Sequence, residues 1–371
     1  MVNHVNPVDL LILQMTEFCN IDCSYCYLPH RSSKKKITKP VITASLERVF
    51  ESAAQDRPFT LVFHAGEPLT APLDLFQHAA DEARRLSNER VSVKLNVQTN
   101  GTLINKTWCD FFIKNDVKVG VSIDGPQALT DLHRKYRSGA GAYAPAIAGI
   151  QLLKENGIPF HIIAVLTSHS LQFPGEIYSF FKSIGPTSVG FNIDEQDGIN
   201  KDSSIYACDE ARYREFWKTL FRIWVDDNRS LEIREFKGIL DLVAHGEQSV
   251  DFINSNQTNR AFSIVTVNTD GGISTFSPEL IAIDGEQSFV YGNVLSDSFE
   301  YILRNPKLIQ DISQINQGVT ACRDSCDYFF FCGGGSPSNK IAETASFEAT
   351  QTEYCRFGKI VIVDEIMKSF D

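Results

Sequence analysis

The sequence predicts an α/β protein in which a partial (β/α)6 barrel is followed by a smaller C-terminal domain. Apolar runs rich in Val, Ile and Phe alternate with helix-like stretches over the first part of the chain, and this alternation then stops. Alternating strands and helices predict a parallel sheet with helices outside it. Six such units are fewer than the eight of a closed barrel, so we expect an open barrel. The expected boundary separates residues 1–230 from residues 231–371.

The six strand–helix units follow one another in a regular order. The strand-like runs are residues 9–15, 59–64, 91–98, 117–123, 158–166 and 187–193. The helix-like stretches are residues 41–55, 72–88, 105–115, 143–156, 171–184 and 209–226. Because both faces of a parallel sheet are buried, its strands consist of nearly continuous apolar runs. We expect the functional residues at the C-terminal ends of these strands.

The C-terminal part has a different pattern. Residues 231–246 have a helical pattern, and residues 262–268 and 273–276 flank a Gly-Gly pair that predicts a hairpin turn. The rest is expected to form short elements around a group of cysteines, with a final helix near residues 356–369.

Composition excludes several classes of protein. Of 371 residues, 43% are hydrophobic and 22% are charged, which excludes general disorder, a collagen-like fibre and a small disulfide scaffold. The net charge of −11 disfavours binding to nucleic acid or anionic membranes, because both need a positive field. The apolar runs at 10–13 and 162–166 fall far short of the roughly 18 residues that cross a bilayer. With no secretory signal pattern, we expect a cytoplasmic protein without nucleic-acid or membrane partners.

Nine cysteines in a cytoplasmic protein need an explanation, because disulfides are disfavoured there and the number is odd. Seven of them fall into two groups. We call Cys19, Cys23 and Cys26 the first cysteine group, and Cys322, Cys326, Cys332 and Cys355 the second cysteine group. Such clustering favours metal ligation. The isolated Cys109 and Cys208 are expected to be structural thiols.

The first cysteine group has the spacing C-x3-C-x2-C and directly follows the first expected strand. Three thiolates on one short loop can hold three irons of a 4Fe–4S cluster. The fourth iron then stays open and becomes a reaction site, as an open position does at catalytic zinc. A zinc site with a fourth ligand such as His30 is the alternative, although zinc ligand pairs more often have the spacing C-x2-C.

At this point the sequence resembles the radical S-adenosylmethionine (SAM) superfamily. The resemblance rests on the first cysteine group and on polar motifs at the ends of successive strands. These motifs are His64-Ala-Gly-Glu-Pro68, Gln98-Thr-Asn-Gly101, Ser122-Ile-Asp-Gly125, His133-Arg-Lys-Tyr-Arg137 and Phe191-Asn192. Taken alone, Gly66-Glu67-Pro68 and Thr99-Asn100-Gly101 are also explained by turns, and Ser122 and Asp124 by a helix cap.

The resemblance implies a cluster whose open iron chelates SAM, and reductive cleavage of SAM to a 5′-deoxyadenosyl radical that removes hydrogen from a substrate. It assigns Glu67 to the amino group of SAM, Arg134 to its carboxylate, and Tyr25 and the end of the sixth strand to adenine. The residues that it assigns to SAM are Tyr25, Gly66, Glu67, Asn100, Ser122, Asp124, Arg134, Phe191 and Asn192. His64 is expected either at this site or in the core.

The second cysteine group resembles the SPASM and twitch auxiliary-cluster domains of radical SAM enzymes. Their usual pattern is C-x2-C-x5-C-x3-C with a later cysteine and further ligands upstream. Here the first spacing is x3, Ser336 occupies the fourth position, and no cysteine lies between Cys208 and Cys322. We therefore expect one auxiliary 4Fe–4S cluster, with a structural zinc site as the alternative. Gly333–Gly335 would let the backbone approach the cluster.

A narrower resemblance concerns function. The stretches Cys26-Tyr-Leu-Pro-His-Arg-Ser and Cys332-Gly-Gly-Gly-Ser-Pro-Ser-Asn-Lys are similar to maturases of glycine-rich-repeat ribosomal peptides, which form cyclophanes. This resemblance implies a C–C crosslink in a ribosomally made peptide, with a reductant such as flavodoxin or ferredoxin. About eight residues precede the first strand, too few for a separate leader-peptide-binding domain.

Other functions stay open at this stage. They are thioether formation, Ser or Cys oxidation on a protein as in sulfatase-maturing enzymes, and sulfur insertion into a small-molecule natural product. The substrate is thus a peptide or a small molecule. A non-catalytic iron–sulfur or zinc protein is the alternative from a different class.

Three carboxylates follow the sixth strand and are the candidates for acid or base catalysis. These are Asp194, Glu195 and Asp197, which we expect to overhang the barrel mouth. A catalytic carboxylate must lie within about 3 Å of the proton that it takes. Ordinary surface carboxylates are the alternative.

Overall fold

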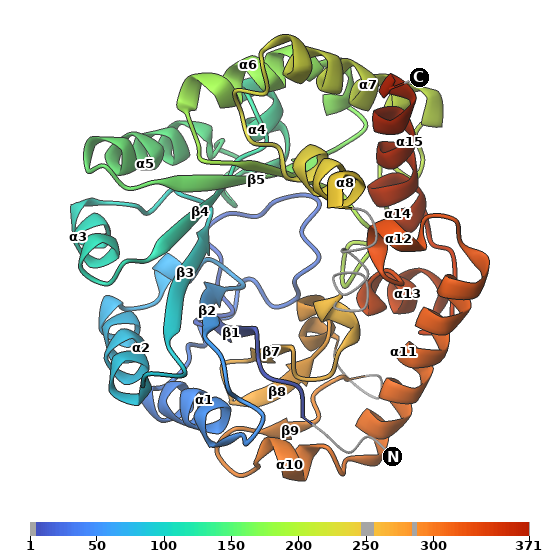
Figure 1. Cartoon of the computed structure of the whole chain (residues 1–371). Coiled ribbons are helices and arrows are strands. Elements are labelled where there is room, and N and C mark those ends of the chain that lie inside the picture. Colours follow the sequence, from blue (N-terminus) through green and yellow to red (C-terminus); the bar gives the residue numbers. More distant parts are fainter. Residues whose placement is uncertain (1–4, 246–255, 284–287, 371) are drawn as a thin grey trace.

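A computed structural model of the chain describes residues 5–245, 256–283 and 288–370. Within these residues one curved sheet has the strand order β6-β5-β4-β3-β2-β1-β7-β8-β9. Helices surround the strands, and the loop after β1 fills the middle of the ring (Figure 1). The predicted partial barrel is confirmed.

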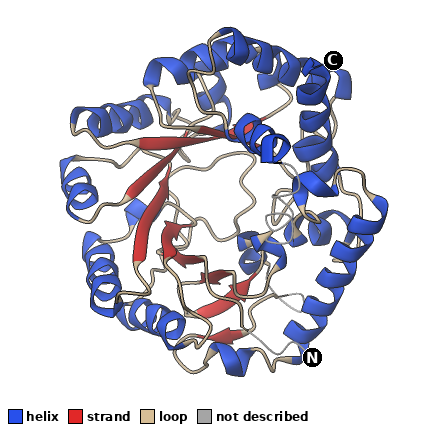
Figure 2. Ribbon diagram, in the orientation of Figure 1, coloured by secondary structure: helices blue, strands red, loops and turns tan. Residues whose placement is uncertain are grey.

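The first six strands lie where the sequence predicts them and pair in parallel with their neighbours (Figure 2). They are β1 (Leu10–Gln14), β2 (Phe59–His64), β3 (Val93–Thr99), β4 (Lys118–Ser122), β5 (Phe160–Leu166) and β6 (Val189–Ile193). Their apolar side chains are buried, because the sheet is covered on its outer face by helices.

The outer helices also match the predicted stretches. They are α1 (Lys39–Glu51), α2 (Leu73–Leu86), α3 (Lys106–Lys114), α4 (Gln127–His133), α5 (Tyr143–Glu155), α6 (Pro174–Ile184) and α7 (Glu210–Asp226). In α2 the buried positions Leu75, Phe76, Ala79, Ala80 and Ala83 recur at helical spacing and form the face that packs inward. Helix α4 is an addition that the sequence analysis did not predict.

The predicted hairpin is present, and it extends the barrel sheet. Strand β7 (Ile264–Val267) pairs in parallel with β1 and antiparallel with β8 (Gly272–Thr275), which pairs with β9 (Gly292–Asn293). Gly271 has φ +88° in the turn between β7 and β8, a conformation that glycine adopts readily. The domain boundary at residue 230 stays a prediction.

Most of the remaining elements complete the ring between β9 and α7 (Figure 1). The helices are α8 (Arg234–His245), α10 (Phe299–Ile302), α11 (Pro306–Ser325), α12 (Phe329–Cys332), α13 (Pro337–Thr344), α14 (Glu353–Cys355) and α15 (Val361–Met367). Short 3-10 turns lie at Gln257–Asn259 and at Pro278–Ala282 (η5). The Arg214 guanidinium of α7 donates to both Asp364 and Glu365 of α15 at 3.0 Å, which ties the end of the chain to the barrel.

The expectation of only short elements around the second cysteine group is wrong, because α11 has 20 residues. Asn305 caps its first turn, and Leu308, Ile312 and Ile315 form a buried stripe along it. In the described part of the chain, every helix is too short or too polar to cross a membrane.

Candidate active site

The loop after β1 brings the first cysteine group together. Cys23 is buried, Cys19 and Cys26 are partly buried, and all three pack in one small apolar cluster. Arg137 holds the loop by donating to the carbonyl oxygens of Cys19 (2.6 Å) and Arg31 (2.7 Å).

The chemistry of these thiols fits a metal cluster. Burial raises the pKa of both Cys19 and Cys23 to about 12, and the other thiols of the group add to the shift. Such thiols stay protonated unless a bound cation displaces the proton. Three of them on one loop form the donor set that the sequence analysis expected.

The turn at Gly66 and Glu67 packs directly against this loop. The Glu67 amide donates to the Phe18 carbonyl at 2.8 Å. Gly66 has φ +61°, and a Cβ atom there would lie 2.7 Å from the Phe18 oxygen, so only glycine fits.

The Glu67 carboxylate links the ends of β2 and β3 by hydrogen bonds. It accepts hydrogen bonds from the Thr99 hydroxyl (2.6 Å), the Asn100 amide (2.7 Å) and one further backbone amide. Burial raises the pKa of Glu67 to about 7, although these hydrogen bonds oppose the shift. The Asn100 side chain donates to Asn20 of the cysteine loop at 2.8 Å, so the carboxylate indirectly positions that loop.

A second buried network contains three of the residues assigned to SAM. Asp124 accepts from the Tyr25 hydroxyl (2.6 Å) and from Nε (3.0 Å) and Nη2 (2.9 Å) of Arg134. The Arg134 guanidinium carbon lies 5.6 Å from the centre of the Tyr25 ring. Arg134, assigned by resemblance to the SAM carboxylate, therefore already has a buried carboxylate partner. The nearby Ser122 hydroxyl accepts from Gln98 at 2.8 Å.

Phe191 and Asn192 point to different sides of β6. The Phe191 ring packs edge-on against Phe181 and Trp217, with centroids 5.9 and 5.8 Å away, so it belongs to the core beneath α6 and α7. The Asn192 side chain accepts from Arg234 of α8 at 2.9 Å. Both residues border a cavity of about 380 Å³ between β6, α8 and the C-terminal helices.

Asp194 has a positioning role in the loop after β6. Its carboxylate is buried and accepts from the amides of Ser204 (2.9 Å) and Ile205 (3.2 Å). Burial raises the pKa of Asp194, and these hydrogen bonds oppose the increase. The side chain therefore fixes the loop that carries the other two candidate carboxylates.

Glu195, Asp197 and Glu279 interact electrostatically, and we call them the acidic cluster. Burial, followed by the charges of Glu279 and Asp197, raises the pKa of Glu195 to about 8. Burial also raises the pKa of Glu279 to about 7 and that of Asp197 to about 6. Asn339 of α13 donates to Glu195, whereas Oδ2 of Asp197 has no hydrogen-bond partner in the described parts of the chain.

The acidic cluster lies between the two cysteine groups. Its charges act on Tyr27, which follows Cys26, and on Tyr354, which precedes Cys355; burial is the first cause of the raised pKa of both tyrosines. Sequence reasoning named Glu195 and Asp197 as candidates but did not name Glu279. Glu279 lies in η5, far along the chain, and no local motif marks it.

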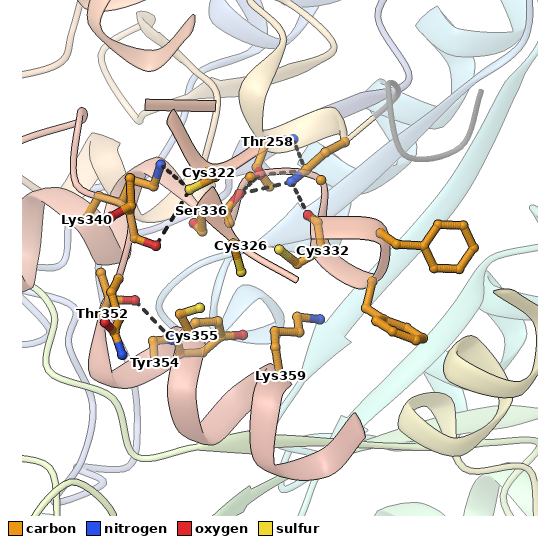
Figure 3. Close-up of a pocket in the computed structure, with 18 residues that line it drawn as sticks. Thr258, Cys322, Cys326, Cys332, Ser336, Lys340, Thr352, Tyr354, Cys355 and Lys359 are labelled. Atoms are coloured by element: carbon orange, nitrogen blue, oxygen red, sulfur yellow. Dashed lines mark hydrogen bonds between the residues drawn. The ribbon is translucent and has the colours of Figure 1, made fainter. Parts of the chain in front are cut away.

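The second cysteine group lines a cavity of about 300 Å³ (Figure 3). Cys322 and Cys326 lie one helical turn apart at the end of α11, which explains the x3 spacing. Burial, followed by the charges of the other three thiols, raises the pKa of Cys355 to about 12. The four sulfur atoms therefore face a common space.

The lining of this cavity offers four thiols as ligands. Both a 4Fe–4S cluster and a structural zinc ion take such a donor set. Among residues 5–245, 256–283 and 288–370, no group of three His, Cys, Asp or Glu side chains is placed to hold a single metal ion. Ser336, at the position of the missing cysteine, hydrogen-bonds to Ser277 (2.8 Å) and Ser338 (3.0 Å).

Known proteins resemble this chain in sequence. The model of the Radical SAM superfamily matches residues 13–181. An uncharacterized protein of Synechocystis sp. is 38% identical over 363 residues, which cover 96% of this chain and 90% of that protein. A serine-type anaerobic sulfatase-maturating enzyme of Bacteroides thetaiotaomicron is 27% identical over 377 residues, covering 94% of this chain and 87% of that enzyme.

Solved structures share the fold over nearly the whole chain. The structure described as native anSMEcpe with bound AdoMet and Cp18Cys peptide has a TM-score of 0.77 and 24% identity, covering 98% of this chain and 96% of that one. Streptococcus suis SuiB bound to precursor peptide SuiA has a TM-score of 0.70 and 16% identity, covering 95% of this chain and 77% of that one. Both likenesses concern the fold.

Proposed function

The chain belongs to the radical SAM superfamily, and we propose that it forms a C–C crosslink in a ribosomally made peptide. It is a radical SAM enzyme related to maturases that modify peptides or proteins. The observation that carries the proposal is the buried acidic cluster between two groups of cysteines. After a hydrogen atom has been removed from the substrate, an oxidative modification must still release one proton and one electron. The acidic cluster can accept the proton, and a metal cluster held by the second cysteine group can accept the electron.

Peptide substrates are supported by the relatives. The solved anSMEcpe and SuiB structures with this fold hold a peptide. A second candidate reaction is the oxidation of a Ser or Cys side chain, because a serine-type anaerobic sulfatase-maturating enzyme aligns with 94% of this chain. Both reactions remove two hydrogen atoms from the substrate.

The cysteines and strand ends are suited to hold the cofactors. We propose that the first cysteine group holds a 4Fe–4S cluster, with SAM bound beside Gly66, Asn100 and Tyr25. The second cysteine group would hold one auxiliary 4Fe–4S cluster. When bound, SAM and the first cluster supply the hydrogen-abstracting chemistry, and the auxiliary cluster supplies an electron acceptor.

Glu195 is our candidate for the proton acceptor. Its pKa of about 8 suits a base that works near neutral pH. A carboxylate with a raised pKa binds a proton more strongly than an ordinary one, and a fraction of it is still ionised at this pH. Asn339 orients it, and Asp194 fixes the loop from which it projects. The burial of this site keeps water away from reactive species.

The test is a reaction under anaerobic conditions with the reconstituted full-length protein, SAM and a chemical reductant. One substrate is a synthetic peptide with aromatic and glycine repeats, and the other contains the Ser or Cys of a sulfatase-type site. We expect 5′-deoxyadenosine with the first peptide, and a peptide lacking two hydrogen atoms whose fragments stay joined in tandem mass spectrometry. A carbonyl on the second peptide would favour the oxidation instead. SAM cleavage without change in either peptide would contradict both reactions.

A further inference from the structure

A buried lysine contacts the second cysteine group. Lys340, on α13, is only 5% exposed, and its ammonium nitrogen lies 3.6 Å from the sulfur of Cys322 (Figure 3). Within residues 5–245, 256–283 and 288–370, no carboxylate lies within 4.0 Å of this nitrogen. A thiol is thus the partner that the fold gives to a buried cation.

The fold makes room for this ammonium. Gly318 lies on α11 one turn before Cys322. A Cβ atom at Gly318 would lie 3.0 Å from the Lys340 nitrogen and 2.1 Å from the Phe347 carbonyl oxygen. The glycine therefore lets α13 approach α11 so closely that the lysine reaches the thiol.

Such a cation needs a compensating anion. Moving a charged group out of water is costly unless an opposite charge and hydrogen bonds replace the water. Four thiolates around a cubane leave a net negative charge, and one-electron reduction adds another. A fixed positive charge and an N–H···S hydrogen bond both favour the reduced form, so they raise the reduction potential.

We propose that Lys340 sets the reduction potential of the cluster held by the second cysteine group, so that this site accepts electrons. This proposal rests on one part of the proposed function, namely that the second cysteine group binds a cluster. Lys359 lines the same cavity from the residues that follow Cys355 (Figure 3). Lys359 makes no hydrogen bond to a thiol within the described residues and is exposed to solvent, which weakens its field at the thiols, so its contribution is expected to be smaller.

The experiment compares Lys340→Met, Lys340→Gln and Lys340→Arg with the parent and with Lys359→Met as the matched control. Each is the full chain, loaded with iron and sulfide, and the potential is read by titration monitored with electron paramagnetic resonance. The measurement is repeated with the first cysteine group replaced by alanines, so that only the auxiliary signal remains. Iron content is measured on every sample.

We expect Lys340→Met to lower the ratio of reduced to oxidised cluster about tenfold at a fixed potential, which is about 59 mV for one electron. In Lys340→Arg, the ratio of reduced to oxidised cluster should stay within a factor of about three of the parent ratio. Lys359→Met should change this ratio less than Lys340→Met does. If Lys340→Met fails to bind iron, Lys340→Gln decides, because it keeps a donor without the charge. An unchanged potential in an iron-loaded Met or Gln variant would overturn the proposal. A missing product with a shifted potential would contradict the proposed function alone.

Discussion

Replacing Glu195 by Gln tests the proposed chemistry most directly. The amide keeps an oxygen for the hydrogen bond from Asn339, but it cannot take a proton. Burial and the charges of Glu279 and Asp197 raise the pKa of Glu195 from 4.5 to about 8. At pH 7 such a group is ionised in about one molecule in eleven, and at pH 9 in about ten of eleven.

If ionised Glu195 accepts the proton, the amount of product per SAM cleaved should rise about tenfold between pH 7 and pH 9. The assay measures 5′-deoxyadenosine and modified peptide in the same samples over this range. Asp197 has a pKa of about 6, so a dependence governed by Asp197 would already level off near pH 7. The position of the rising limb therefore distinguishes the two carboxylates.

The variants sharpen the test. Glu195→Gln should still cleave SAM but lose product by about 10²- to 10⁴-fold, the usual contribution of general acid–base catalysis. Glu279→Gln removes a neighbouring negative charge, so the pKa of Glu195 should fall and the rising limb should move to lower pH. Product formation at the parent rate by Glu195→Gln would refute the assignment of the base.

Three further predictions concern the cysteines and the buried ion pair. Replacing the whole first cysteine group by alanine should abolish 5′-deoxyadenosine, while iron analysis still finds about four of the expected eight irons per chain; retained SAM cleavage would contradict the assignment. Cys355→Ala should uncouple the reaction, so that SAM cleavage persists and product falls, with soluble yield as the control for misfolding. Normal product from a folded variant without the auxiliary cluster would show that this cluster is structural. Asp124→Asn leaves the Arg134 cation buried without its carboxylate and should destabilise the fold by about 3–5 kcal/mol, measured by denaturant unfolding against the exposed control Asp110→Asn.

Local patterns explain which features could be predicted from sequence. The strands depend on short apolar runs, and the first cysteine group spans eight residues of one loop, so neither needs knowledge of distant contacts. Helix α11 also had local signals, namely the Asn305 cap and the spacing of Leu308, Ile312 and Ile315. It was missed because its many polar residues make it look like a loop.

Other features depend on contacts between distant parts of the chain. Glu279 affects the pKa of Glu195 only because η5 folds close to the loop after β6. Lys340 meets Cys322 only because α13 packs against α11. The partner of Arg134 could not be predicted from the sequence either. The resemblance assigns Arg134 to SAM, whereas in the fold Arg134 donates to Asp124. Sequence can name such residues as polar, but it cannot say which charge they will meet.

The buried carboxylates and the buried lysine have opposite charges and lie at different parts of the site. In the proposed function, carboxylates gather where a proton would be held, and a lysine without a carboxylate partner among the described residues lies where an electron would be held. Each charge favours its own product, because a buried negative group binds a proton tightly and a buried positive group stabilises added negative charge. If the two were exchanged, both the proton and the electron would be disfavoured. Under the proposed function, the acidic cluster and Lys340 therefore both favour the forward direction of an oxidation that releases one proton and one electron.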